Sequence, residues 1–262
     1  MPRFAANVSL LFSEVPLPER FARARAAGFE AVECWWPFET PEPSAAQVGA
    51  FVRALDDAEV RLTGINLFAG DMPGGERGIV SHPDRADELA ANLAVVRTIV
   101  EATGCACVNA LYGQRLPGVP GEAQDEVATR NLRRAVDALG EVGATVLVEP
   151  LTRGENGDYP VRTLDDALAV VDRVGDGAAV LFDAYHLHNN GADVVVDIGR
   201  VAGAVGHVQV ADSPGRGEPG TGTIDFEAFF RALDATGYTG WVGCEYRPTT
   251  ETEQTLAWLP TP

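Results

Sequence analysis

One phrase recurs along the chain: an alanine-rich run ends at a glycine, and a short β-branched run follows. Examples are AAGFEAVE, EVGATVLVE and ATGYTGWVGCE. Glycine ends helices because it adopts the left-handed conformation without strain, and Pro18 suits the first turn of a helix that ends at Gly28. The phrase is typical of repeated strand and helix units, and it constrains the fold more than any other feature of the sequence.

Eight strands are expected where β-branched and apolar residues cluster. They are Phe4–Leu10, Ala31–Trp35, Leu62–Leu67, Cys107–Leu111, Thr145–Glu149, Ala179–Asp183, His207–Ala211 and Trp241–Glu245. Seven helices are expected between them: Leu17–Ala27, Ser44–Asp57, Asp84–Ala102, Glu122–Glu141, Thr163–Arg173, Val194–Ala202 and Phe226–Thr236.

Eight such units in 262 residues average about 33 residues each, the usual size of one β-α unit. No glycine- or serine-rich linker divides the chain, so we expect residues 1–262 to form a single (β/α)8 TIM-barrel domain. A doubly wound sheet is the alternative. It is less favoured because no G-x-G-x-x-G motif follows the first strand.

The composition excludes several classes of protein. All 20 basic residues are arginine, and without lysine there is no Schiff-base aldolase, pyridoxal-phosphate enzyme or P-loop nucleotidase. We therefore expect no organic cofactor. A net charge of −18 repels nucleic acid, and no apolar run reaches the roughly 20 residues that span a bilayer.

The N-terminus and the cysteines indicate a cytoplasmic protein. The stretch MPRFAANVSLLFSEVP alternates like a strand and has no small-residue cleavage site, so we interpret it as the first strand and not as a signal peptide. The four cysteines form no C-x-x-C pair, which predicts reduced thiols.

Polar side chains stand at or near the ends of four consecutive predicted strands. They are Glu149, Asp183, Gln209 and Glu245, separated by 34, 26 and 36 residues. In a closed barrel, side chains at the carboxyl ends of the strands surround one opening, where active sites of this fold lie. Three partly desolvated carboxylates repel one another unless a cation joins them. With an amide oxygen they form a hard-oxygen site that suits Mg²⁺ or Mn²⁺; zinc is less favoured because the four lack His and Cys.

His186 lies three residues beyond Asp183, in what we expect to be the start of a loop. From the residues alone it is a metal ligand, a proton carrier or a donor to substrate, or else a capping or packing histidine. His188 and His207 are interpreted as structural or exposed. Two long loops, Asn66–Asp84 and Leu111–Gly121, also follow strands and so lie on the same face of the barrel.

These residues occur in phrases that resemble the hydroxypyruvate isomerase family, within the xylose-isomerase-like barrels. The phrases are RFAANVSLLF, GFEAVE, AGDMPGGERG, VEP, FDAYH, GHVQVADSPGRGEPGTG and GWVGCEYRP, and they extend from residue 3 to residue 248.

The resemblance implies a metal-dependent isomerase that interconverts hydroxypyruvate and tartronate semialdehyde. It implies that Glu149, Asp183, Gln209 and Glu245 bind the metal, and that Glu149 and Glu245 also move the proton. It implies that His186 and Arg216 hold substrate oxygens, with Arg216 suited to a carboxylate. Asn66 and Glu76, in the third loop beside Arg77, are further candidates to contact a small substrate.

Several alternatives stay open. Glu155 matches a loop in which ketose epimerases place a substrate-binding glutamate, so a sugar substrate and ketose 3-epimerisation stay open, as does a related acid such as 2-oxo-tetronate. A nucleic-acid enzyme of the endonuclease IV type would need more histidines and a basic rim, and a non-catalytic binding barrel would not need clustered carboxylates. Trp35, Trp36 and Phe38 line either the pocket or a subunit interface, which leaves a homo-oligomer open.

Overall fold

The predicted barrel is present in the computed structural model, which describes residues 2–260. Eight parallel strands close in the order β1 to β8, and β8 pairs with β1. The strands are β1 (Arg3–Asn7), β2 (Ala31–Cys34), β3 (Arg61–Asn66), β4 (Cys107–Asn109), β5 (Thr145–Val148), β6 (Ala178–Asp183), β7 (Val205–Val210) and β8 (Trp241–Cys244). Most are shorter than the apolar runs that predicted them, so Glu149 and Glu245 each lie one residue beyond a strand.

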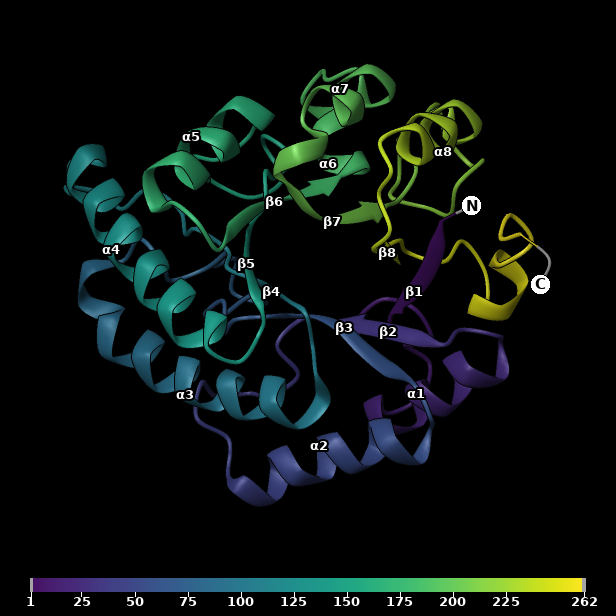
Figure 1. Cartoon of the computed structure of the whole chain (residues 1–262), viewed down its shortest axis with the longest axis horizontal. Coiled ribbons are helices and arrows are strands. Elements are labelled where there is room, and N and C mark those ends of the chain that lie inside the picture. The colour runs from purple at the N-terminus through teal and green to yellow at the C-terminus, as the bar shows by residue number, and fades with distance from the viewer. Residues whose placement is uncertain (1, 261–262) are drawn as a thin grey trace.

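Helices follow the strands and surround the barrel as a ring (Figure 1). They are α1 (Leu17–Ala26), α2 (Ala45–Asp57), α3 (Ala86–Thr103), α4 (Gly121–Gly140), α5 (Leu164–Val174), α6 (Ala184–Asn189), α7 (Val194–Arg200) and α8 (Phe226–Ala235). Short 3-10 turns cover Pro83–Arg85, Ala202–Ala204 and Thr252–Thr255. None of the helices in residues 2–260 has the length and apolar content needed to cross a membrane.

Helix α6 was not predicted, and its presence corrects the loop expected at His186. The carboxylate of Asp183 caps this helix: Oδ1 accepts the backbone N–H groups of Tyr185 at 2.8 Å and His186 at 3.3 Å. An aspartate cap satisfies backbone donors that a helix start otherwise leaves unpaired. The segment is too short for a periodic apolar pattern, so the sequence offered only the cap as a signal.

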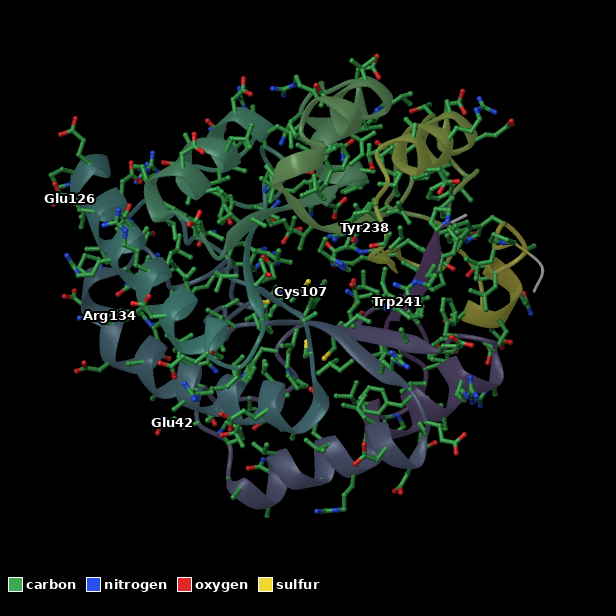
Figure 2. All side chains as sticks on the ribbon, in the orientation of Figure 1. Glu42, Cys107, Glu126, Arg134, Tyr238 and Trp241 are labelled. Carbon is green, nitrogen blue, oxygen red and sulfur yellow. The ribbon has the colours of Figure 1, made fainter. Side chains whose placement is uncertain are left out.

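Two apolar layers lie on the two sides of the strands. The outer one, between strands and helices, contains fully buried rings such as Phe21, Phe182 and Phe229. The inner one consists of Cys107, Leu147 and Leu181. Cys107 accordingly lies near the centre of Figure 2, while charged side chains such as those of Glu126 and Arg134 on α4 lie at the outside. The rest of the barrel interior is polar, and that is where the candidate site begins.

Candidate active site

The four polar residues predicted at the strand ends come together at the carboxyl end of the barrel. Asp183 and Gln209 are register partners on β6 and β7, and Gln209 is also paired with Gly243 on β8, two residues before Glu245. Glu149 follows β5 directly. All four side chains are buried, with 1–5% of each residue exposed. The spacing of one β-α unit therefore places these groups side by side.

Two oxygen atoms of this set are buried without a hydrogen-bond partner among the described residues. They are Oδ2 of Asp183 and Oε1 of Gln209. A buried, unpaired polar atom costs about 1–3 kcal/mol, so native structures seldom retain one without a purpose. Carboxylate and amide oxygens are the donors that hard divalent cations take. The donor set therefore fits a divalent metal ion.

Burial makes the carboxylates difficult to ionise together. Burial, with further contributions from Glu245 and Asp183, raises the pKa of Glu149 well above its ordinary value. Burial also raises the pKa of Glu245 to about 8, although Arg216 opposes this. A divalent cation would favour the ionised forms because it supplies the compensating charge.

His186 is next to two of these carboxylates. Its Nε2 lies 3.8 Å from Oε1 of Glu149 and 3.7 Å from Oδ2 of Asp183. One atom from each of Glu149, Asp183 and His186 falls within 4.8 Å of the others, a spacing that a metal ion could bridge. Distance alone would therefore make His186 a ligand.

The hydrogen bond on the other side of the ring argues against that role. The backbone N–H of Thr152 donates to Nδ1 of His186 at 3.1 Å, and the Thr152 hydroxyl lies 2.7 Å from the same nitrogen. Because the amide N–H can only donate, these contacts favour an Nδ1 that carries no proton. Burial lowers the pKa of His186 to about 4, so the ring is neutral near pH 7. A neutral imidazole whose Nδ1 accepts must carry its proton on Nε2. That atom is a donor, and it is not available to a metal.

Arg216 closes the opposite side of the site. Its Nη2 pairs with Oε1 of Glu245 and lies 3.8 Å from Oδ2 of Asp183, and its guanidinium lies over the ring of Tyr185. The backbone of Arg216 has φ +59°, a left-handed conformation that a non-glycine residue needs its surroundings to hold.

Asp212 holds the loop that carries Arg216. Its Oδ2 accepts the backbone N–H groups of Gly220 and Gly222, each at 2.8 Å, and its Oδ1 accepts that of Ile224 at 3.1 Å. Asp212 itself is fully buried. The carboxylate of Asp212 therefore ties the two ends of this loop together.

Asn7 on β1 and Asn109 on β4 support the carboxylates and were not predicted from the sequence, and so does Trp35, directly after β2, for which the pocket and an interface were both left open. Nδ2 of Asn109 donates to Glu149 at 2.7 Å. Nδ2 of Asn7 donates to Glu245 at 3.0 Å, and Nε1 of Trp35 donates to it at 3.2 Å. Trp35 therefore belongs to the site. Asn7 and Asn109 end their strands, so the strand-end signal used for β5 to β8 would have found them too.

The remaining candidates lie in different surroundings. Asn66 ends β3, buried, and lines a small cavity inside the barrel together with Asn109. Glu76 is tied within its own loop, because Arg85 donates to its Oε1 at 2.8 Å and the Asp71 N–H donates to its Oε2 at 2.6 Å. Glu155 accepts the hydroxyl of Tyr185 at 3.2 Å.

Arg77, the neighbour of Glu76, is connected to the site. Its Nε donates to Oδ1 of Asn156 at 3.0 Å, and Nδ2 of Asn156 donates to the carbonyl of Thr152 at 3.0 Å. Thr152 is the residue that contacts Nδ1 of His186. Burial, and then the nearby charge of Arg216, lower the pKa of Arg77.

Comparison with known proteins agrees with this fold. The sequence model of the family described as xylose isomerase-like TIM barrel matches residues 21–261. The hydroxypyruvate isomerase of Escherichia coli is 33% identical over 99% of this chain and 98% of its own length. A Streptomyces coelicolor protein, whose name carries that activity provisionally, is 44% identical over 98% of this chain and 95% of its own length.

Solved structures give the same picture. The crystal structure of an AP endonuclease, family 2, from Brucella melitensis has a TM-score of 0.90 and 36% identity, covering 98% of each chain. A closed (β/α)8 barrel with buried carboxylates at the carboxyl ends of its strands defines a TIM-barrel enzyme of the isomerase class. The chain belongs to the xylose isomerase-like TIM-barrel family and, within it, to the hydroxypyruvate isomerases.

Proposed function

We propose that this protein is a metal-dependent isomerase that interconverts hydroxypyruvate and tartronate semialdehyde (2-hydroxy-3-oxopropanoate). The observation that carries the proposal is the pair of buried glutamates, Glu149 and Glu245, beside the unpaired oxygens of Asp183 and Gln209. Moving a carbonyl between adjacent carbons through an enediolate requires a base, an acid and a means to stabilise negative charge on oxygen.

Glu149, Asp183, Gln209 and Glu245 would hold a divalent cation, Mg²⁺ or Mn²⁺. The cation would stabilise the negative charge that develops on the substrate oxygens. The preference for these two metals rests on the all-oxygen donor set, because zinc in proteins favours histidine and cysteine.

Glu149 and Glu245 are the groups that we assign to proton transfer. One takes the proton from the hydroxyl-bearing carbon of hydroxypyruvate, and the other delivers a proton to the neighbouring carbon. Burial raises the pKa of both carboxyl groups, that of Glu245 to about 8. A carboxyl group whose pKa lies near the working pH can both accept and donate a proton.

His186 and the two arginines are the groups that we assign to substrate. Nε2–H of His186 is directed toward the carboxylates and can donate to a substrate oxygen. Among residues 2–260, no group accepts a hydrogen bond from Nη1 of Arg216 or from Nη2 of Arg77. Two guanidinium groups with free N–H bonds suit the carboxylate of an acid substrate.

A related acid is the second candidate. The 2-oxo-tetronate isomerase of Cupriavidus necator is 34% identical over 99% of this chain and 98% of its own length. A free ketose is less favoured, because Glu155 is engaged with Tyr185. An endonuclease is disfavoured despite the name of the Brucella structure, because this chain has four histidines and a net charge of −18.

The deciding experiment is a panel of hydroxypyruvate, 2-oxo-tetronate and free ketohexoses, each assayed after metal removal and again with Mg²⁺ or Mn²⁺. We expect turnover of an acid, lost with chelator and restored by the metal. Turnover of a ketohexose with none of either acid would overturn the assignment.

We also propose that residues 1–262 form one domain and that the protein acts in the cytoplasm, where its four free, buried cysteines stay reduced. A homo-oligomer is compatible with this proposal.

A further inference from the structure

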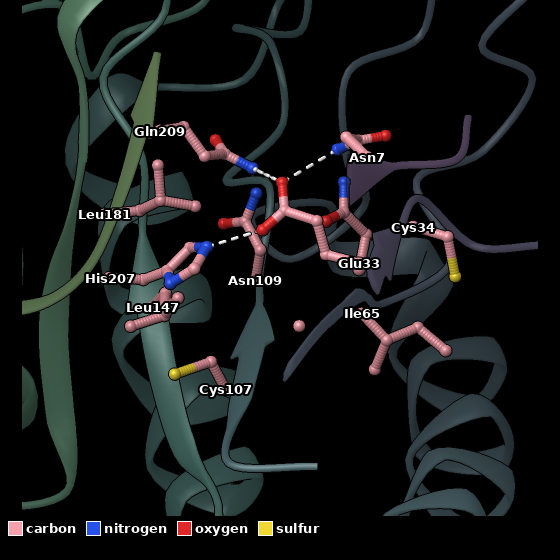
Figure 3. Close-up of a pocket in the computed structure, with 12 residues that line it drawn as sticks. Asn7, Glu33, Cys34, Ile65, Cys107, Asn109, Leu147, Leu181, His207 and Gln209 are labelled. Atoms are coloured by element: carbon pink, nitrogen blue, oxygen red, sulfur yellow. Dashed lines mark hydrogen bonds and ion pairs between the residues drawn. The ribbon is translucent and has the colours of Figure 1, made fainter. Parts of the chain in front are cut away.

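A third buried glutamate lies inside the barrel, below the proposed metal ligands. Glu33 is on β2 and is 2% exposed. Its Oε1 accepts Nδ2 of Asn7 at 2.9 Å and Nε2 of Gln209 at 2.7 Å. Its Oε2 lies 2.5 Å from Nε2 of His207. Figure 3 shows this carboxylate at the centre of side chains from β1, β2 and β7.

The barrel leaves room for this carboxylate at a glycine. A Cβ atom built on Gly243 of β8 would lie 2.3 Å from Oε1 and 2.4 Å from Oε2 of Glu33. Any other residue at this position would displace the carboxylate. Burying a charged group is costly unless it is paired and hydrogen-bonded. Three hydrogen-bonding partners and a space that fits the carboxylate indicate that the fold accommodates Glu33 at this buried position.

The carboxylate determines how Gln209 is oriented. Oε1 of Glu33 accepts the hydrogen bond from Nε2, so Gln209 presents its NH₂ group to this carboxylate. The oxygen of the same amide then points away, and it is one of the two buried oxygens without a partner. If the amide were reversed, its oxygen would face a carboxylate.

A second connection runs through Asn7. Its Nδ2 donates both to Oε1 of Glu33 and to Oε2 of Glu245, at 2.9 Å and 3.0 Å. One amide group therefore holds Glu245 at a fixed position relative to Glu33. Two of the four proposed ligands, Gln209 and Glu245, are thus linked to this single carboxylate.

We propose that Glu33 is a positioning residue for the metal site: it fixes Gln209 with Oε1 available as a ligand and, through Asn7, holds Glu245 in place. This inference rests on the proposed function, because it takes Gln209 and Glu245 as ligands. Residues that orient metal ligands typically contribute 10- to 100-fold to metal affinity.

The test compares the substrate-free wild type with Glu33→Gln, with Gly243→Ala and with the control Cys107→Ala. For each protein, Mn²⁺ affinity is measured by titration calorimetry, and the electron paramagnetic resonance spectrum of bound Mn²⁺ is recorded. Glutamine has one acceptor oxygen, so at position 33 it cannot serve the donors on both sides. Gly243→Ala shifts the carboxylate without removing it. Cys107 lines the same cavity, and its thiol donates to the carbonyl of Gly206, not to Glu33, Asn7 or Gln209.

We expect Mn²⁺ affinity to fall about 10- to 100-fold in Glu33→Gln and Gly243→Ala, with an altered spectrum, and to stay at the wild-type value in Cys107→Ala. Thermal unfolding of the metal-free proteins is measured alongside. If the two variants unfold at lower temperature but bind Mn²⁺ as wild type does, Glu33 has only a structural role and the inference is overturned. If the wild type itself binds no Mn²⁺, the proposed function fails, and the inference fails with it.

Discussion

His186 and Thr152 are joined by a hydrogen bond in which the backbone N–H of Thr152 donates to Nδ1 at 3.1 Å. The Thr152 hydroxyl lies 2.7 Å from the same nitrogen, and the two contacts together favour the tautomer that decides the role of the residue. The proton lies on Nε2, on the side of Glu149 and Asp183. A histidine beside two carboxylates would ordinarily be counted among the ligands of a metal, but here it is arranged to donate a hydrogen bond.

The first prediction concerns His186. We expect His186→Ala to keep Mn²⁺ affinity close to that of the wild type, while kcat/KM falls about 100-fold, because a donor to a substrate oxygen is lost. Calorimetric titration with Mn²⁺ and steady-state kinetics at saturating metal would measure the two effects. A large loss of Mn²⁺ affinity would instead make His186 a ligand.

The second prediction concerns the two proton-transfer residues. In Glu149→Gln and Glu245→Gln, assayed at saturating Mn²⁺, we expect kcat to fall about 10²- to 10⁴-fold, because each variant lacks one acid-base group. In D₂O, one of the two variants should still exchange the carbon-bound hydrogen of hydroxypyruvate while failing to form product. That variant identifies the glutamate that acts at the second carbon. Full turnover in both would refute the assignment.

The third prediction concerns pH and the metal-free protein. Burial raises the pKa of Glu245 from 4.5 to about 8, so the folded state binds a proton more tightly than the unfolded chain. This contribution to stability is present in full below about pH 4.5 and is lost as pH rises through about 8. A bound cation favours the ionised carboxylate instead. Melting temperatures with EDTA and with Mn²⁺ should therefore diverge increasingly from pH 5 to pH 8; a constant difference would contradict this.

The fourth prediction concerns the acid-binding side of the pocket. Arg77→Gln should raise the KM for an acid substrate about 10-fold or more and leave Mn²⁺ affinity unchanged, because a charge-assisted hydrogen bond is lost. Glu76→Gln is the matched control, since Glu76 is paired with Arg85 within the loop. If the control raises KM as much as Arg77→Gln does, the effect comes from the loop and not from the guanidinium.

Much of this architecture could be predicted because each β-α unit carries a local sequence signal. A glycine ends the helix, a β-branched run forms the strand, and a polar residue stands where the strand ends. The register of a closed parallel barrel then brings Glu149, Asp183, Gln209 and Glu245 together without further information.

What could not be predicted depends on contacts between distant strands. Glu33 and His207 are separated by 174 residues, and either one alone is typical of a surface or a packing position. His207 was interpreted as structural or exposed, and it is in fact buried against Glu33. The tautomer of His186 depends on a backbone N–H that lies 34 residues away, which no local pattern encodes.

The carboxylate of Asp183 has two roles in this proposal, since Oδ1 caps α6 and Oδ2 has no hydrogen-bond partner among the described residues and is a proposed metal ligand. A substitution at this position would therefore affect both the start of α6 and the proposed metal site. Asparagine has one side-chain oxygen, which could cap α6 or bind the metal but not both. The longer side chain of glutamate would extend beyond the capping position. In a lineage that lost its metal, aspartate could persist here as the start of a helix, so its presence in a sequence is weaker evidence of catalysis than that of Glu149.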